Sequence, residues 1–132
     1  MNEPAQQKPK PLNGVHVLHV DDDRLVRIVA AAMLSRLGAR AISAADGHAA
    51  IAALDQPEAR IDVVLLDVVM PGFDGLATLH EIRRRRPTIP VVLCSGTGVD
   101  LTRLDPSLGS PIVLEKPFIL STLEKALESA LR

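Results

Sequence analysis

The chain has 132 residues, of which 15 are basic and 16 acidic, so its net charge is −1. This balance argues against a basic surface built to bind nucleic acid, and a single cysteine excludes an internal disulfide framework. No apolar run reaches the roughly 20 residues of a membrane span, and the N-terminus lacks the apolar segment of a signal peptide. We therefore expect one cytoplasmic domain that binds neither DNA nor membrane directly.

The first twelve residues differ in character from the rest of the chain. Residues 1–12 are polar, carry three prolines and show no apolar periodicity, which predicts a flexible tail. Residues 13–132 are expected to form the folded domain. Its core must be aliphatic, because the chain has two phenylalanines and no tryptophan or tyrosine.

Apolar runs and helical patterns then alternate along the chain. A strand is predicted at Val15–Val20, followed by a helix over 24–37 that stops at Gly38. Within this helix, apolar residues recur at the three- and four-residue spacing that is typical of a helix: Leu25, Ile28, Val29, Ala32 and Met33.

The same alternation continues to the C-terminus. Strands are predicted at 39–44, 61–66, 89–94 and 111–114, and helices at 47–54 (capped by Asp46), from Gly75 to the arginine run before Pro87, and at 120–131. Five strands separated by helices predict an α/β fold, a doubly wound five-stranded parallel sheet with helices on both faces. In such sheets the working site lies at the C-terminal ends of the strands.

Chemically active side chains follow four of these strands. The first strand is followed by Asp21-Asp22-Asp23, the third by Asp67, the fourth by Ser95 and the fifth by Lys116. Converging carboxylates repel one another unless a cation lies between them, and Mg²⁺ prefers oxygen ligands of this kind. An ionised Asp67 can attack phosphorus without a general base and form an acyl phosphate, with Lys116 and Ser95 contacting the phosphoryl oxygens.

These residues stand in motifs that resemble the receiver domain of two-component response regulators, the CheY-like family. The motifs are Val20-Asp21-Asp22-Asp23, then Asp67-Val68-Val69-Met70-Pro71-Gly72-Phe73-Asp74-Gly75, then Ser95-Gly96, then Lys116-Pro117-Phe118. They cover residues 13–132 in the order and spacing of the family. The resemblance implies a flavodoxin-like fold with five helices and strand order 2-1-3-4-5.

The resemblance also implies a metal site and a phosphoacceptor. Asp21 and Asp22 would be the Mg²⁺-binding acids, and Asp67 would both accept the phosphoryl group and contact the metal. The backbone carbonyl of Val69 would supply a further ligand, and Mn²⁺ would serve as a substitute ion. The apolar Val69 side chain cannot orient an attacking water, so we expect a longer-lived acyl phosphate than with a polar residue there.

A conformational switch is implied by the same family pattern. Ser95 would be the switch hydroxyl, Lys116 its ion-pair partner, and a cis peptide bond before Pro117 would direct Lys116 inward. The family's switch aromatic corresponds to Val113, so aromatic rotation cannot be the readout here. Pro106 interrupts the fourth helix of the family, and we expect a short or irregular element over 98–106.

The resemblance implies a signalling module and not an enzyme acting on other molecules. It would take a phosphoryl group from a histidine kinase or a histidine phosphotransfer protein and signal to a downstream protein that the sequence does not identify. One alternative is a phosphorylation-independent scaffold with a receiver-like fold. Another is a Mg²⁺-dependent aspartyl phosphohydrolase, in which Asp21 and Asp23 would form the D-x-D pair.

Two charged features favour structural roles. Asp23 is expected to cap the first helix, and Asp74 the helix that opens at Gly75. The residues Arg83–Arg86 sweep most of the way around a helix, so they form no single basic stripe, and cations are favourable at a helix C-terminus. We therefore interpret the run as a solvated helix end.

Overall fold

The computed structural model describes residues 9–69, 75–96 and 111–132. These residues form the elements β1 (His16–Val20), α1 (Arg24–Arg36), β2 (Arg40–Ala44), α2 (Gly47–Leu54), β3 (Val63–Asp67), α3 (Gly75–Arg85), β4 (Val91–Ser95), β5 (Ile112–Glu115) and α4 (Leu120–Leu131). Every predicted strand and helix within the described ranges is therefore confirmed, with boundaries shifted by one or two residues. The expected cap Asp74 and the expected irregular element over 98–106 lie outside the described residues.

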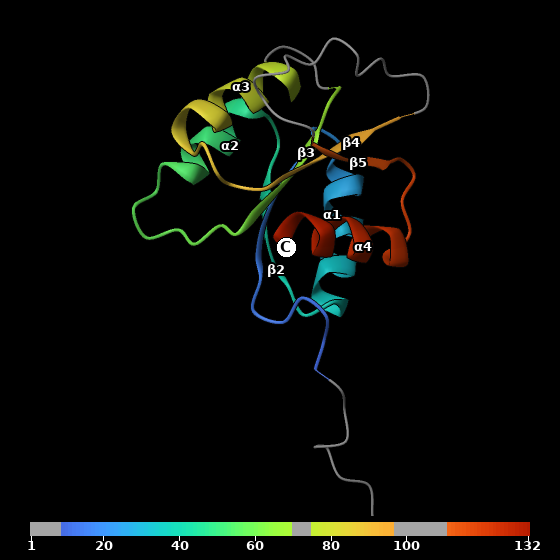
Figure 1. Ribbon diagram of the computed structural model, residues 1–132. Helices are drawn as coiled ribbons and strands as arrows, with labels where there is room; N and C mark the ends of the chain where they lie inside the picture. Colours follow the sequence, from blue (N-terminus) through green and yellow to red (C-terminus); the bar gives the residue numbers. More distant parts are fainter. Residues whose placement is uncertain (1–8, 70–74, 97–110) are drawn as a thin grey trace, which may run out of the picture.

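The five strands form one parallel sheet in the order β2-β1-β3-β4-β5. Helices α1 and α4 cover one face, and α2 and α3 cover the other (Figure 1). The predicted doubly wound α/β fold and the strand order are confirmed. Because β1 and β3 are neighbours, the residues that follow these two strands lie side by side at the C-terminal edge.

The sheet centre is enclosed by apolar side chains on both faces. All five residues of β3 and of β4 are buried, as expected for strands covered by helices on both sides. One apolar layer joins the sheet to α2 and α3, and the other joins it to α1 and α4. Leu12, in the expected tail, is part of the second layer, and its N–H donates to the carbonyl of Leu37 (2.8 Å). The folded unit therefore includes Leu12.

The helix predicted from this apolar spacing is present as α1, but most of the spaced residues do not lie on its buried face. Leu25, Ile28 and Val29 are 68%, 54% and 45% exposed, whereas Ala30 and Leu34 are fully buried. Ala32 is also exposed, and Met33 is half-buried against the core. Apolar residues cover most of this helix, so their spacing alone could not identify the inner face. The positions that contact the sheet are the smaller Ala30 and the Leu34 one turn later.

The helix ends follow their predicted chemistry. The Asp23 carboxylate accepts hydrogen bonds from the N–H groups of Leu25 (2.8 Å) and Val26 (3.3 Å), and Asp46 accepts one from the N–H of Ala49 (2.7 Å). Gly38 has a φ of +90° just beyond α1, a conformation that favours glycine. These contacts confirm both N-caps and the glycine stop.

The arginine run is only partly solvated. Arg83 and Arg86 donate to the backbone carbonyls of Ile89 and Leu54, respectively, and Arg85 pairs with Asp55. Arg84 pairs with Glu81 at the exposed surface of α3. Three of the four side chains therefore join α3 to α2 or to the loop before β4. Over the described part of the chain, no helix has the length and apolarity needed to cross a membrane.

Candidate acidic site at the strand ends

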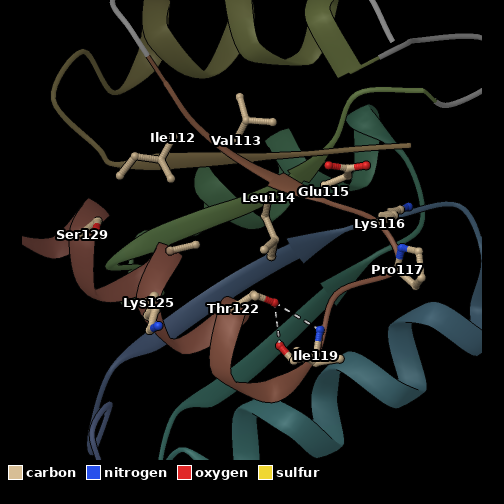
Figure 2. Close-up of a pocket in the computed structure, with 11 residues that line it drawn as sticks. Ile112, Val113, Leu114, Glu115, Lys116, Pro117, Ile119, Thr122, Lys125 and Ser129 are labelled. Atoms are coloured by element: carbon tan, nitrogen blue, oxygen red, sulfur yellow. Dashed lines mark hydrogen bonds between the residues drawn. The ribbon is translucent and has the colours of Figure 1, made fainter. Parts of the chain in front are cut away.

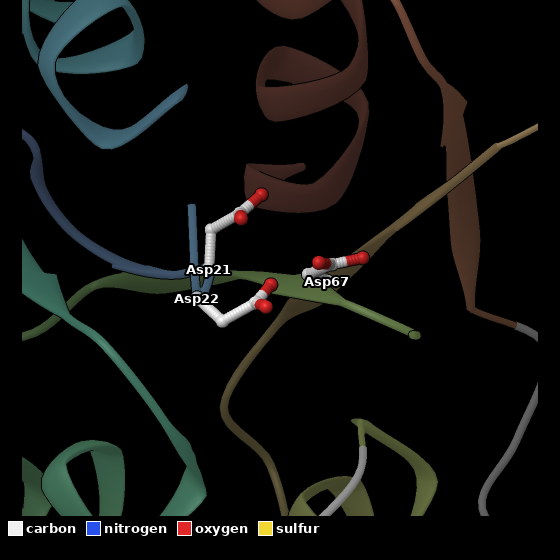
Figure 3. Close-up of side chains that lie close together, drawn as sticks. All are labelled: Asp21, Asp22 and Asp67. Atoms are coloured by element: carbon white, nitrogen blue, oxygen red, sulfur yellow. The ribbon is translucent and has the colours of Figure 1, made fainter. Parts of the chain in front are cut away.

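Three carboxylates meet where β1 and β3 end (Figure 3). Asp21 follows β1 and is fully buried, Asp67 is the last residue of β3 and is 5% exposed, and Asp22 is exposed. Each residue offers one carboxylate oxygen, and these three oxygens lie within 4.8 Å of one another. The structure thus brings together the acids that the sequence analysis singled out.

Asp21 is held by contacts with β2, with its own loop and with the segment that follows β5. Its N–H donates to the carbonyl of Ala44 at the end of β2 (3.1 Å). Its Oδ1 accepts a hydrogen bond from the N–H of Asp23 (2.9 Å), and its Oδ2 accepts one from Lys116 Nζ (2.6 Å). Asp22 is exposed and lies between these fixed neighbours. Its carboxylate is therefore the more accessible ligand for an incoming cation.

Lys116 joins the two buried acids. Its Nζ lies 2.6 Å from Asp21 Oδ2 and 3.3 Å from Asp67 Oδ2. The peptide bond between Lys116 and Pro117 is cis, as predicted. Burial alone would lower the pKa of Lys116, but the hydrogen bond to Asp21 and the nearby Asp67 charge outweigh it and raise that pKa. Lys116 is therefore held as a cation.

The electrostatics of Asp67 reflect its burial among charges. Burial raises the pKa of the Asp67 carboxyl, the Lys116 cation opposes that rise, and the Asp21 charge adds to it. The N–H of Val69 donates to Asp67 Oδ1 (3.2 Å), which also favours the ionised form. A further cation beside Asp67 would act in the same direction as Lys116.

The end of β3 is also shaped by the start of α3. The N–H of Gly75 donates to the carbonyl of Val68 (3.2 Å). A Cβ at this position would lie 2.5 Å from Val68 Cα and closer still to the carbonyl oxygen of Asp67. Glycine therefore allows α3 to begin directly against the residue that bears the buried carboxylate.

The remaining predicted site residues lie around this cluster. Ser95 is the last residue of β4 and is buried, and its carbonyl accepts a hydrogen bond from the N–H of Lys116 (2.7 Å). Val69, two residues after Asp67, is 63% exposed. One carboxylate oxygen of Asp23 accepts hydrogen bonds from N–H groups at the N-terminus of α1, so Asp23 serves as a cap.

Val113 lies on β5, a strand that lines a groove of about 720 Å³ beside α4 (Figure 2). It is 43% exposed. In Figure 2, Leu114 points toward α4, whereas Val113 points to the opposite side of the strand. This position therefore holds a small, partly exposed aliphatic side chain where the family pattern has an aromatic ring.

A second, largely apolar pocket of about 450 Å³ lies between α1 and the segment that follows β5. The exposed apolar residues of α1 extend to its rim. Lys116, which contacts both buried acids, is one of its lining residues; the others are Leu25, Val26, Val29, Ala30, Met33, Pro117 and Phe118. The apolar surface of α1 is thus continuous with the acidic site.

Two residues that shape the site were not singled out by the sequence pattern. Arg27 Nη1 donates to the backbone carbonyl of Asp21 (2.8 Å), and Gly75 permits the close approach of α3 to β3. The Asp-Gly pair before α3 indicates a turn, but the space required at Gly75 depends on the packing of two elements. The Arg27 contact is made to a backbone atom, which leaves no signature in the sequence.

Comparison with known proteins identifies the family. Residues 17–128 match the response regulator receiver domain. The chain is 39% identical over 103 residues to the transcriptional regulatory protein CpxR of Klebsiella pneumoniae, covering 77% of this chain and 43% of CpxR. It is 38% identical over 117 residues to the transcriptional activator protein PfeR of Pseudomonas aeruginosa, covering 88% and 37%. The chain thus spans less than half the length of these relatives.

Solved structures agree with this assignment. The Vibrio cholerae chemotaxis protein CheY4 superimposes with a TM-score of 0.80 at 30% identity, covering 89% of this chain and 98% of CheY4. The receiver domain of NtrX from Brucella abortus gives a TM-score of 0.75 at 36% identity, covering 87% and 97%. The chain belongs to the response regulator receiver family, whose members are signalling modules of two-component systems.

Proposed function

We propose that this domain accepts a phosphoryl group on Asp67 from a phosphohistidine of a sensor kinase or a histidine phosphotransfer protein. The observation that carries the proposal is the setting of Asp67, a buried carboxylate 3.3 Å from the Lys116 ammonium and grouped with Asp21 and Asp22. Burying so much charge is costly for a structural element, which favours a chemical role.

In the proposed reaction an Asp67 carboxylate oxygen attacks phosphorus in line with the bond to the donor imidazole. The P–O bond to Asp67 forms as the P–N bond breaks, and the imidazole nitrogen keeps the electron pair of that bond. Lys116 can contact an oxygen of the transferred phosphoryl group, because its Nζ already lies beside Asp67 Oδ2. The domain would catalyse this transfer and the later hydrolysis of its own acyl phosphate, but no reaction of other molecules.

The three carboxylates fit a Mg²⁺ site in their chemistry. Asp21, Asp22 and Asp67 offer only oxygen ligands, the set preferred by this ion, and Mn²⁺ would substitute for it. The backbone carbonyl of Val69 is proposed as a further ligand. When bound, the ion supplies positive charge that neutralises the phosphoryl oxygens.

The exposed apolar residues of α1 suggest where the phosphoryl donor binds. Leu25, Ile28 and Val29 form an exposed stripe that leads into the apolar pocket beside Lys116. A donor protein must bring its phosphorus to Asp67, so it must contact the surface of this domain around that residue. We therefore assign this stripe to the donor protein, since exposed apolar patches commonly mark protein interfaces.

Signal output is proposed to start at Ser95 and Lys116. Both residues flank the acidic site, and the N–H of Lys116 donates to the carbonyl of Ser95. Val113 cannot supply an aromatic switch, so the downstream protein would sense the Ser95 and Lys116 rearrangement without one. That this domain itself binds no DNA stays a prediction.

Of the alternatives, the phosphohydrolase is disfavoured by the position of Asp23. Its Oδ1 accepts hydrogen bonds from the N-terminus of α1, which accounts for Asp23 as a helix cap, and a D-x-D pair would leave the buried Asp67 without a role. A phosphorylation-independent scaffold would leave the burial of Asp21 and Asp67 beside Lys116 without a chemical purpose.

The test is intact-mass analysis after incubation with acetyl phosphate. With Mg²⁺ present, the chain should gain the mass of one phosphoryl group and then stop. Asp67→Asn, or removal of Mg²⁺ with a chelator, should abolish the gain. Continuous hydrolysis of a generic phosphomonoester would favour the phosphohydrolase, and no gain in the unaltered chain would favour the scaffold.

A further inference from the structure

Arg27 connects the second turn of α1 to the loop that bears the acids. It is half-buried, and its Nη1 lies 2.8 Å from the carbonyl oxygen of Asp21. The backbone N–H of Arg27 donates to the carbonyl of Asp23 (3.0 Å), which is the first hydrogen bond of α1 after its N-cap. One residue of α1 thus contacts both ends of the Asp21–Asp23 loop.

The carbonyl of Asp21 depends on this contact. The pairing of β1 with β3 ends at Val20, so the next carbonyl along the chain lies beyond that ladder. Asp21 is fully buried, which leaves its carbonyl little access to solvent water. Its other polar groups are bonded to Ala44, Asp23 and Lys116. Arg27 completes the set of contacts that fix this residue.

We propose that Arg27 is a positioning residue that holds the Asp21–Asp23 loop, and with it the two acids that would bind the metal. The part of this inference that concerns the metal rests on the proposed function. Groups that orient metal ligands without touching the metal commonly control its affinity. Arg27 acts in this way through a backbone carbonyl.

The proposal differs in sign from a purely electrostatic effect. Arg27 is a cation near three carboxylates, so removal of its charge alone should strengthen the binding of Mg²⁺. Loss of positioning should instead weaken binding, because the two acids would no longer be held in one arrangement. Arg24, an exposed arginine in the first turn of the same helix, provides a control of equal charge.

The experiment compares the unaltered chain with Arg27→Gln, Arg27→Lys and Arg24→Gln. Amide hydrogen exchange of Asp23 is followed by NMR in the metal-free proteins, since its N–H donates to Asp21 Oδ1 within the loop. Mg²⁺ affinity is measured by calorimetry. Arg27→Gln should accelerate Asp23 exchange and weaken Mg²⁺ binding by about tenfold, with Arg27→Lys intermediate and Arg24→Gln close to the unaltered chain.

Unchanged exchange at Asp23, or Mg²⁺ binding in Arg27→Gln as tight as in the unaltered chain or tighter, would overturn the proposal. If Arg27→Gln does not fold, Arg27→Lys decides by the same two measurements. Failure of the unaltered chain to bind Mg²⁺ would count against the proposed function, and exchange at Asp23 would then decide alone whether Arg27 holds the loop.

Discussion

The acidic site and the outer face of α1 are neighbours. The first buries charged side chains, and the second exposes apolar ones. At the strand ends, Asp21 and Asp67 are buried, whereas on α1, Leu25 and Ile28 are 68% and 54% exposed. Burying charge and exposing apolar surface both cost free energy. Both departures occur around Lys116, which contacts the buried acids and lines the pocket next to α1.

The two regions differ in how the cost is offset. The two buried carboxylates are compensated within the chain by Lys116 and by the N–H groups of Asp23 and Val69. The outer face of α1 stays open to solvent over the residues that the structure describes. The charges of the acidic site are thus balanced within the chain, whereas the exposed stripe on α1 is the surface that we propose the phosphoryl donor covers.

The largest expected effect separates the two faces of α1. Leu34→Ala removes a fully buried side chain and should lower the free energy of unfolding by about 3 to 5 kcal/mol. Leu25→Ala, the matched change on the exposed face of the same helix, should alter it by less than about 0.5 kcal/mol. Urea unfolding followed by circular dichroism measures both. Equal losses would mean that Leu25 is part of the core.

A second prediction concerns His19, a buried polar residue without the compensation given to the acids. Among the described residues, neither of its ring nitrogens has a hydrogen-bond partner. Burial lowers the pKa of His19 from 6.5 to about 4, with nearby Lys116 and Arg27 acting in the same direction and Asp21 against it. Protonation therefore favours the unfolded chain, so this residue's contribution to stability is complete above pH 6.5 and is lost as the pH falls toward 4.

The loss at pH 4 should be about 3 kcal/mol relative to neutral pH. His19→Val removes the titrating group, so unfolding of the metal-free variant should depend less on pH between 4 and 6.5 than unfolding of the unaltered chain. It should also be more stable at neutral pH, since two unpaired nitrogens are removed. Parallel pH profiles for the two proteins would contradict the assignment.

A third prediction tests the partner assigned to α1. Ile28→Glu should slow phosphotransfer from a cognate phosphotransfer protein by about thirtyfold, which corresponds to roughly 2 kcal/mol of interface energy. Ile28→Leu should transfer normally, and acetyl phosphate should label all three proteins at similar rates, because a small donor needs no docking surface. Slower labelling of Ile28→Glu by acetyl phosphate would place the defect in the chemical site.

The smallest expected effect is at Val69, which is exposed beside Asp67. An asparagine there can hydrogen-bond an attacking water, whereas valine cannot. Val69→Asn should therefore hydrolyse its acyl phosphate about fivefold faster, the equivalent of one hydrogen bond of roughly 1 kcal/mol. Intact-mass analysis over time after removal of the donor measures the rate. Val69→Ala is the control, and equal acceleration in it would implicate loss of bulk.

The sequence was sufficient to predict a site residue where the end of a strand determined the position of its side chain. Asp21, Asp67 and Lys116 meet because parallel strands deliver their C-terminal residues to one edge, and that follows from the element pattern. The inner face of α1 did not follow, because apolar residues lie around most of that helix. The contact of Arg27 and the space needed at Gly75 depend on packing between elements, which local patterns do not encode.

The most direct test of the central claim is the location of the phosphoryl group. After labelling with acetyl phosphate and Mg²⁺, borohydride reduces an aspartyl phosphate to homoserine, and peptide mass spectrometry identifies the altered residue. Phosphorylation of Asp67 would give homoserine at position 67 alone, in proportion to the phosphoryl group gained. Modification at position 21 or 22 instead, or a labelled chain with Asp67 intact, would contradict it.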